Sequence, residues 1–166
     1  MTEAPRLWYL WARELLVEIG FVELCCARAV FILQDKGRTV AMLTLHVDDG
    51  LLAGDQENKV YKKAVQGINS KFNIKEWNDL EKGEVADYLG MQWHQDEEGV
   101  TVNMDKYMKG ITEMKVKNKT DLEEKLDDDG VHAFRSVLAN VRWPVSHVVP
   151  ELAYGGSSLA QTSPQA

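Results

Sequence analysis

Near the start of the chain, hydrophobic side chains recur every three or four positions over residues 5–19, the spacing that places them on one face of an α-helix. Pro5 suits a first helical turn, and Gly20 is a typical helix stop. The apolar face comprises Leu7, Trp8, Trp11, Ala12, Leu15, Leu16 and Ile19. The pattern predicts a helix that packs this face, with Trp8 and Trp11, into a core.

After this helix, the hydrophobic pattern becomes that of β-strands. Two β-rich stretches, 27–34 and 39–47, flank a short polar loop whose composition is typical of a hairpin. A sharp Asp-Asp-Gly turn follows, and the chain is apolar again from Leu51. We therefore predict that the second strand pairs antiparallel with a strand beginning at Leu51, with Asp48 and Asp49 at the turn between them.

The rest of the chain alternates between the two patterns. A helix capped by Asp55 would present an apolar face made of Val60, Tyr61, Ala64, Val65, Ile68 and Phe72. The remaining expected elements are strands at 85–95 and 99–104, a helix over roughly 105–115, and short helices at 131–143 and 151–161, which Pro144 and Pro150 separate. This order predicts an α+β fold, an antiparallel sheet with flanking helices.

Composition narrows the class of protein. The 166 residues are 45% hydrophobic and 27% charged, which is typical of a globular chain with a core. The net charge of −7 repels nucleic acid, so binding a polyanion would need a local basic strip. No apolar run is long enough for a membrane span, and the first residues lack a signal pattern, so we expect an intracellular protein, cytoplasmic or nuclear. Cys25 and Cys26 are neither a disulfide framework nor a metal pair at useful spacing.

The main candidate for chemistry is the pair Asp48 and Asp49 at the tip of an apolar hairpin. Neighbouring carboxylates repel each other unless a cation neutralises them, and Mg²⁺ prefers such hard oxygen ligands. The alternative is structural, because Asp-Asp-Gly is also a good turn sequence. A second acidic run at 127–129 lacks the alternation of a calcium loop and is interpreted as a solvated linker.

The segment from Leu45 to Asp55 resembles the catalytic hairpin of reverse transcriptases of the Ty1/copia retrotransposon class. That family usually has Tyr-Val-Asp-Asp, and His46 replaces the tyrosine here. Other segments in the family's order cover residues 4–161. They are Ala4-Pro5-Arg6-Leu7-Trp8, Phe31-Ile32, Lys71-Phe72 with Tyr88-Leu89-Gly90-Met91, Gly99-Val100-Thr101-Val102 with Lys106-Tyr107, Phe134-Arg135-Ser136-Val137-Leu138 and Pro150-Glu151-Leu152-Ala153-Tyr154.

The resemblance implies a polymerase architecture and activity. Residues 1–116 would be part of a palm and the entry to a thumb, 117–130 an acidic linker, and 131–166 a C-terminal helical segment and tail. The parent activity would be RNA-directed DNA polymerisation with Mg²⁺ and nucleoside triphosphates on an RNA or DNA template-primer. The residues implied in the site are Asp48 and Asp49 as catalytic metal ligands, with Arg6, His46, Tyr88, Leu89 and Gly90 near nucleic acid or nucleotide.

The chain also departs from the family pattern. The family completes its two-metal site with a third aspartate upstream of the Ala-Pro-Arg segment, and this chain begins three residues before Ala4. We therefore expect a chain truncated at its N-terminal side, without that aspartate or the fingers. Two functional alternatives stay open: a fragment of a polymerase that acts with other segments of the retroelement, and a non-catalytic remnant or reused binding domain.

Overall fold

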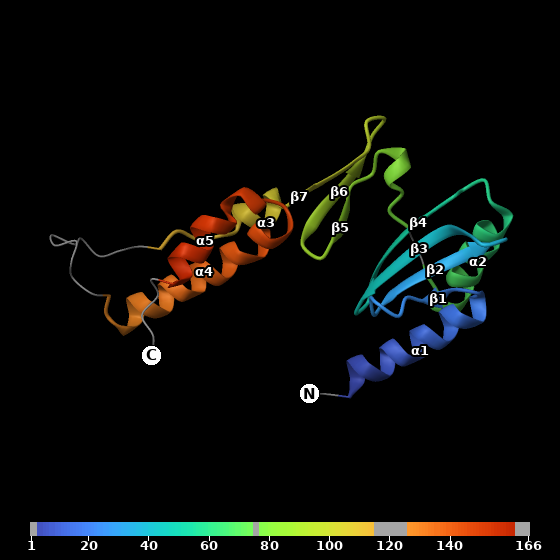
Figure 1. Cartoon of the computed structure of the whole chain (residues 1–166), viewed down its shortest axis with the longest axis horizontal. Coiled ribbons are helices and arrows are strands. Elements are labelled where there is room, and N and C mark those ends of the chain that lie inside the picture. Colours follow the sequence, from blue (N-terminus) through green and yellow to red (C-terminus); the bar gives the residue numbers. More distant parts are fainter. Residues whose placement is uncertain (1–2, 75–76, 115–125, 162–166) are drawn as a thin grey trace. The chain divides into compact units, whose positions relative to one another are not determined.

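The chain forms two compact units, residues 1–79 and 80–166. The structure, a computed structural model, describes residues 3–74, 77–114 and 126–161 (Figure 1). Each unit combines helices with one antiparallel sheet, which confirms the predicted α+β class. The proposed division into palm, linker and C-terminal segment stays a prediction, and residues 117–125 of that linker lie outside the described residues.

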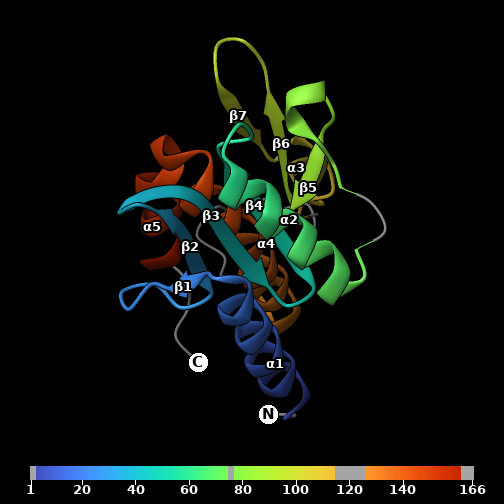
Figure 2. The ribbon, with the colours of Figure 1, turned by 90° about the vertical axis from the view of Figure 1, so that its right-hand side faces the viewer.

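The first unit is a four-stranded antiparallel sheet covered on one face by two helices. The strands follow one another in the order β1-β2-β3-β4. In Figures 1 and 2, α1 and α2 lie side by side against this sheet. The elements are α1 (Ala4–Ile19), β1 (Val22–Glu23), β2 (Val30–Asp35), β3 (Arg38–His46), β4 (Asp49–Gly54) and α2 (Lys59–Phe72).

The core of this unit lies between the helices and the sheet. Alternate residues of β2 and β3 point toward the helices, as the two-residue period of a strand requires. The cluster consists of Leu16, Phe21, Phe31, Leu33, Ala41, Leu43, Ala64 and Ile68. Burying each large side chain contributes about 1.5–3 kcal/mol, so this cluster holds the sheet on which the Asp-Asp hairpin is built.

The start of α2 corrects one sequence prediction. Asn58, rather than Asp55, caps the helix: its side-chain oxygen accepts hydrogen bonds from the N–H groups of Val60 (2.8 Å) and Tyr61 (3.3 Å). Asp55 instead accepts a bond from the N–H of Glu57 at 3.0 Å within the preceding turn. Both side chains suit either role, and sequence alone did not distinguish a turn from the cap that follows it.

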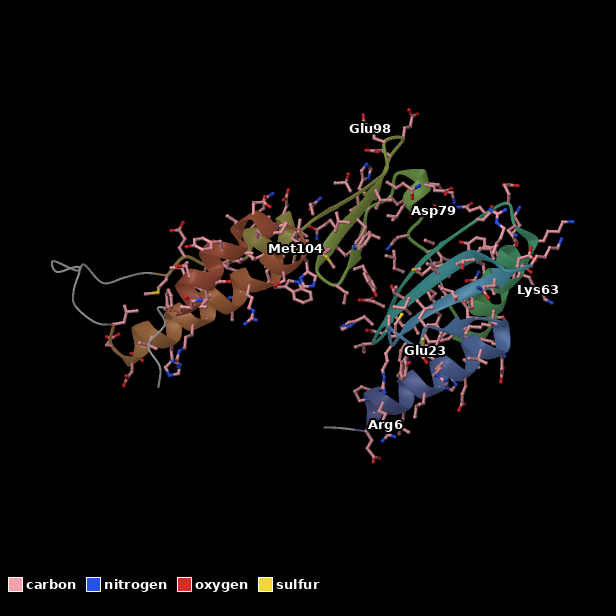
Figure 3. All side chains as sticks on the ribbon, viewed as in Figure 1. Arg6, Glu23, Lys63, Asp79, Glu98 and Met104 are labelled. Carbon is pink, nitrogen blue, oxygen red and sulfur yellow. The ribbon has the colours of Figure 1, made fainter. Side chains whose placement is uncertain are left out.

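A half-buried carboxylate ties the loop before β2 to α1. Glu23, labelled in Figure 3, accepts hydrogen bonds from Tyr9 Oη, from Arg13 Nε at 2.6 Å and from the N–H of Ala29 at 3.2 Å. Burial alone would raise the pKa of Glu23, but these three bonds together outweigh it and lower the pKa. The ionised carboxylate is therefore part of the fold of the first unit.

The second unit contains a three-stranded antiparallel sheet, ordered β5-β6-β7, and several helices. Its elements are η1 (Leu80–Lys82), β5 (Ala86–Tyr88), β6 (Met91–Gln95), β7 (Val100–Asn103), α3 (Asp105–Lys109), α4 (Asp128–His147), η2 (Pro150–Leu152) and α5 (Ala153–Gln161). The predicted strand 85–95 is wrong as one element, because the chain reverses at Leu89-Gly90, both with positive φ. The helix predicted to reach 115 ends at Lys109.

The longest helix, α4, runs through Pro144, where the sequence predicted a break. A proline lacks the N–H that would bond to the carbonyl four residues earlier, here that of Asn140. The hydroxyl of Tyr107 donates to this carbonyl at 3.2 Å, which supplies the missing partner. The helix also starts earlier than predicted, because the carboxylate of Asp127 caps it by accepting from the N–H of Gly130 at 2.8 Å. The interpretation of the acidic run at 127–129 as a linker is therefore wrong, since these residues are the cap and first turn of α4.

Within the described ranges, no helix is both long enough and apolar enough to cross a membrane.

Candidate functional site

The Asp-Asp hairpin forms as predicted, with β3 and β4 antiparallel. Two-residue hairpin turns usually contain glycine, often as Asn-Gly. Here the two turn residues are Val47 and Asp48, and neither is glycine. His46 lies opposite Asp49, which is the first residue of β4. The turn is thus one residue earlier than predicted, and Gly50 belongs to the strand.

The backbone at the hairpin tip is strained. Val47 has φ of 53°, a conformation that a β-branched residue rarely adopts. Such a residue costs on the order of 1–3 kcal/mol unless its surroundings impose the conformation. Its side chain is 58% exposed, so burial does not compensate for this cost. The strain therefore lies directly beside the two carboxylates.

Asp48 and Asp49 are both exposed, with Cα atoms about 3.8 Å apart, as in any trans dipeptide. Within the described part of the chain, neither carboxylate has a salt bridge or side-chain hydrogen bond. Two carboxylates about 4 Å apart in water repel each other by about 1 kcal/mol. The hairpin thus presents two adjacent negative charges whose oxygens are available to a ligand.

A cavity of about 450 Å³ opens beside these carboxylates within the first unit. Residues from α1, β3, the turn after it, β4 and α2 line it, together with Ile74 and Trp77. The lining consists of Trp8, Trp11, Leu16, Leu43, Leu45, Asp48, Asp49, Gly50, Ile68, Phe72, Ile74 and Trp77. Among these residues the two aspartates carry the only charges, so the cavity is apolar inside and negative at the hairpin.

The tryptophans of this cavity are not among the residues that the family resemblance placed near nucleic acid or nucleotide. The sequence placed Trp8 and Trp11 in the core, but Trp11 is 46% exposed, and its ring meets that of Phe72 edge-on at 5.4 Å between centroids. Trp77 is anchored by a hydrogen bond from its Nε1 to the side-chain oxygen of Asn69 at 2.7 Å. A hydrophobic stripe identifies an apolar face, but it does not distinguish a core from a cavity wall.

The two carboxylates of the hairpin do not by themselves make a complete metal site. Among the described residues, no three side chains of the histidine, cysteine, aspartate or glutamate type are grouped to hold an ion. Two carboxylates nevertheless match the chemistry of Mg²⁺, which takes one or two protein carboxylates and fills its remaining positions with water or substrate phosphate. Asp48 and Asp49 therefore fit a divalent ion whose other ligands come from elsewhere.

The other residues singled out from the sequence lie at several places. His46 ends β3 and is exposed near the two carboxylates, while Arg6 is exposed in the first turn of α1 (Figure 3). Tyr88, Leu89 and Gly90 belong to the second unit, where Tyr88 is buried and the other two form the β5–β6 turn. The structure thus brings His46 together with the aspartates in one hairpin.

Comparison with known proteins assigns the chain to a family. The sequence profile described as reverse transcriptase (RNA-dependent DNA polymerase) matches residues 1–125. The Pol polyprotein from transposon RE2 of Arabidopsis thaliana is 28% identical over 107 residues, 64% of this chain and 7% of that protein. The polyprotein from transposon RE1 of the same plant is 29% identical over 80 residues, 48% of this chain and 5% of that protein. No solved structure matches.

The chain thus spans less than a tenth of the length of these two curated relatives. Both relatives are retrovirus-related polyproteins of transposons, and this origin confirms the resemblance that the ordered motifs indicated. The profile covers the Asp-Asp hairpin, the cavity and the whole first unit. The chain therefore belongs to the reverse transcriptase family and is a reverse transcriptase fragment of the copia type.

Proposed function

We propose that this chain supplies the metal-binding carboxylates of an RNA-directed DNA polymerase that extends a primer on an RNA or DNA template with deoxynucleoside triphosphates. The observation that carries this proposal is the β3–β4 hairpin, which holds Asp48 and Asp49 next to each other, exposed and without partners among the described residues. Family membership supports a divalent metal and nucleic acid in general terms. The assignment of Asp48 and Asp49 as its ligands is part of the proposal.

A bound divalent ion would supply Lewis-acid stabilisation of the charge that develops during phosphoryl transfer. The chain's own contribution is positional. The β3–β4 ladder fixes the backbone on both sides of the turn, so the two carboxylates project from a rigid support rather than from a loose loop. Asp48 is the more direct ligand in this proposal, and Asp49 completes the negative charge that attracts the ion.

The same charges make metal binding a condition for substrate binding. A nucleoside triphosphate and a template-primer are polyanions, and both are repelled by the unneutralised aspartates and by the net charge of −7. In this proposal Arg6 and His46 lie in the vicinity of the nucleotide or template. By the family resemblance the Leu89-Gly90 turn would also lie near nucleic acid, whereas the side chain of the neighbouring Tyr88 is buried.

A hybrid polymerase tests the proposal. In it, this chain replaces the matching stretch of the Pol polyprotein from transposon RE2, and RNA-templated DNA synthesis is measured with Mg²⁺. We expect Asp48→Asn to reduce the rate of synthesis by about a hundredfold or more, because a carboxylate ligand of the metal is lost.

The matched control is Asp55→Asn, seven positions further along the chain. Asp55 is also exposed, and an asparagine there can still accept the bond from the N–H of Glu57. We expect this variant to keep nearly full activity. Equal activity of the Asp48→Asn hybrid and the unmodified hybrid would contradict the proposal and favour a non-catalytic role for the hairpin.

A further inference from the structure

The cavity beside the hairpin has the size and lining of a small-molecule site. Its volume of about 450 Å³ falls in the range of about 300–1,000 Å³ that is typical of ligand pockets. Aromatic side chains from three parts of the unit form its walls: Trp8 and Trp11 on α1, Phe72 at the end of α2, and Trp77 beyond it. A divalent ion at the aspartates needs none of these aromatic walls.

The charges around the cavity favour a ligand with a positive charge. Asp48 and Asp49 are the charged residues of the described lining, and neither has a cationic partner in the part of the chain that the structure describes. Aromatic faces also attract cations, tryptophan most strongly. Carboxylates and indoles therefore favour the same kind of ligand, one that combines a planar apolar body with a positive charge.

We propose that this cavity is a binding site for a hydrophobic organic cation. The planar aromatic part would occupy the space between the tryptophans, and an attached ammonium group would lie against Asp48 and Asp49. This inference goes beyond the polymerase function and does not depend on it, because it rests on the volume, the aromatic walls and the charge of the cavity.

Three probes of nearly the same shape and different charge test the proposal on the full chain: 2-naphthylmethylammonium, neutral 2-naphthylmethanol and anionic 2-naphthoate. Binding is followed through the five indole N–H signals in ¹⁵N NMR spectra, assigned with single Trp→Phe variants. Trp8, Trp11 and Trp77 line the cavity, whereas Trp93 and Trp143 belong to the second unit and serve as internal references.

We expect the ammonium probe to shift the signals of Trp8, Trp11 and Trp77 and to leave those of Trp93 and Trp143 in place. It should bind about fivefold or more tightly than the alcohol, and the naphthoate should bind most weakly. In Asp48→Asn/Asp49→Asn the preference for the ammonium probe over the alcohol should fall to about one. That result would separate the contribution of charge from that of the apolar walls.

Two variants on α1 test whether the probes bind at the cavity wall or elsewhere on the helix surface. Trp11→Ala removes an exposed wall residue and should weaken binding of all probes. Val17→Ala, at a position that is 51% exposed and outside the lining, should leave binding unchanged. If Trp11→Ala does not fold, the proposal is still tested by Asp48→Asn/Asp49→Asn, through its preference for the ammonium probe over the alcohol.

Three results would overturn the proposal. One is shifts of equal size at all five tryptophans, which would show non-specific adsorption. Another is equal affinity of the ammonium and alcohol probes for the unmodified chain. The last is a change in the signals of Trp8, Trp11 and Trp77 with protein concentration alone, which would show that a second copy of the chain covers the cavity.

Discussion

Two hairpins of this chain have the same length and contrasting surroundings. Each has a two-residue turn whose first residue is not glycine and has positive φ: Val47 between β3 and β4, and Leu89 between β5 and β6. In the second hairpin the residues that flank the turn are buried, Tyr88 being 8% and Met91 7% exposed. In the first they are His46 and Asp49, and both are exposed.

The turn residues also suit the backbone conformation better in the second hairpin than in the first. Gly90 has φ of 74° and follows Leu89 in the second hairpin, as a turn with two positive φ values favours. The first hairpin combines a β-branched residue at positive φ with two adjacent carboxylates and no buried flanking side chain. One hairpin is thus built mainly for stability, while the other tolerates strain and charge repulsion where function would use the exposed groups.

The two hairpins should differ most in the loss of stability when the residue before the turn is replaced by alanine. Tyr88→Ala should destabilise the second unit by about 3 kcal/mol, because it empties a buried site whose ring contacts Trp93. His46→Ala should change the stability of the first unit by less than about 0.5 kcal/mol. Urea unfolding followed by residue-resolved NMR measures both, with exposed Tyr154→Ala as the control for loss of a tyrosine.

Next in size is the effect of a side chain at Gly90. Gly90→Ala should cost about 1–2 kcal/mol, since an L-residue is unfavourable at this φ, while the nearest atom to the added Cβ, on Tyr107, is 3.9 Å away. Gly155→Ala in α5 is the matched control, because its Cβ meets no atom within 4 Å and its φ is not positive. It should stabilise the second unit slightly, as alanine favours a helix. Equal effects of the two substitutions would contradict the role given to φ.

In the first hairpin, a glycine introduced at the position with positive φ should raise the stability. Val47→Gly should stabilise the first unit by about 1 kcal/mol, because the relief of strain exceeds the added entropy of the unfolded glycine. Val22→Gly is the control, because Val22 lies in β1, is equally exposed and does not have a positive φ. Its replacement should destabilise the first unit. Destabilisation by Val47→Gly would mean that the tip is not strained.

The smallest expected effect concerns Asp87, beside the second hairpin. Hydrogen bonds from Gln92 (2.8 Å) and then Lys106 (2.9 Å) lower the pKa of this carboxyl. Its stabilising contribution is therefore complete above the unfolded pKa, about 3.9, and is lost as pH falls through the lower folded value. Gln92→Leu should raise the pKa of Asp87 in a ¹³C carboxyl titration, and an unchanged value would exclude the Gln92 bond as its main cause.

The sequence predicted those features that depend on local periodicity. The helix α1, the Gly20 stop, the β3–β4 pairing and the helix α2 all follow from spacing over a few residues, although Leu7 and Trp11 of the predicted core face of α1 are exposed. It did not predict the reversal at Leu89-Gly90, because a leucine at positive φ has no sequence signal. Nor did it predict that α4 continues through Pro144, since the compensating hydroxyl belongs to Tyr107, which lies 33 positions before Asn140, the residue whose carbonyl it contacts.

The candidate site was predictable in its chemistry but not in its shape. The Asp-Asp pair and the ordered motifs indicated a reverse transcriptase, and the family comparison confirms it. The cavity could not be predicted, because its walls come from α1, α2, β3 and β4 and from Trp77, and only packing brings these together. The exposure of Trp11 and the strain at Val47 are likewise properties of the folded unit.

Paramagnetic line broadening by Mn²⁺ tests the central claim most directly, that the Asp48-Asp49 hairpin is the divalent-ion site of this chain. Because two carboxylates leave most of the coordination shell to water, binding should be weak, with a dissociation constant of about a millimolar or higher. Broadening of ¹⁵N–¹H signals should be centred on Val47 to Gly50 and should disappear in Asp48→Asn/Asp49→Asn. Broadening centred instead on Asp127 to Asp129, and unchanged in that double variant, would contradict the account.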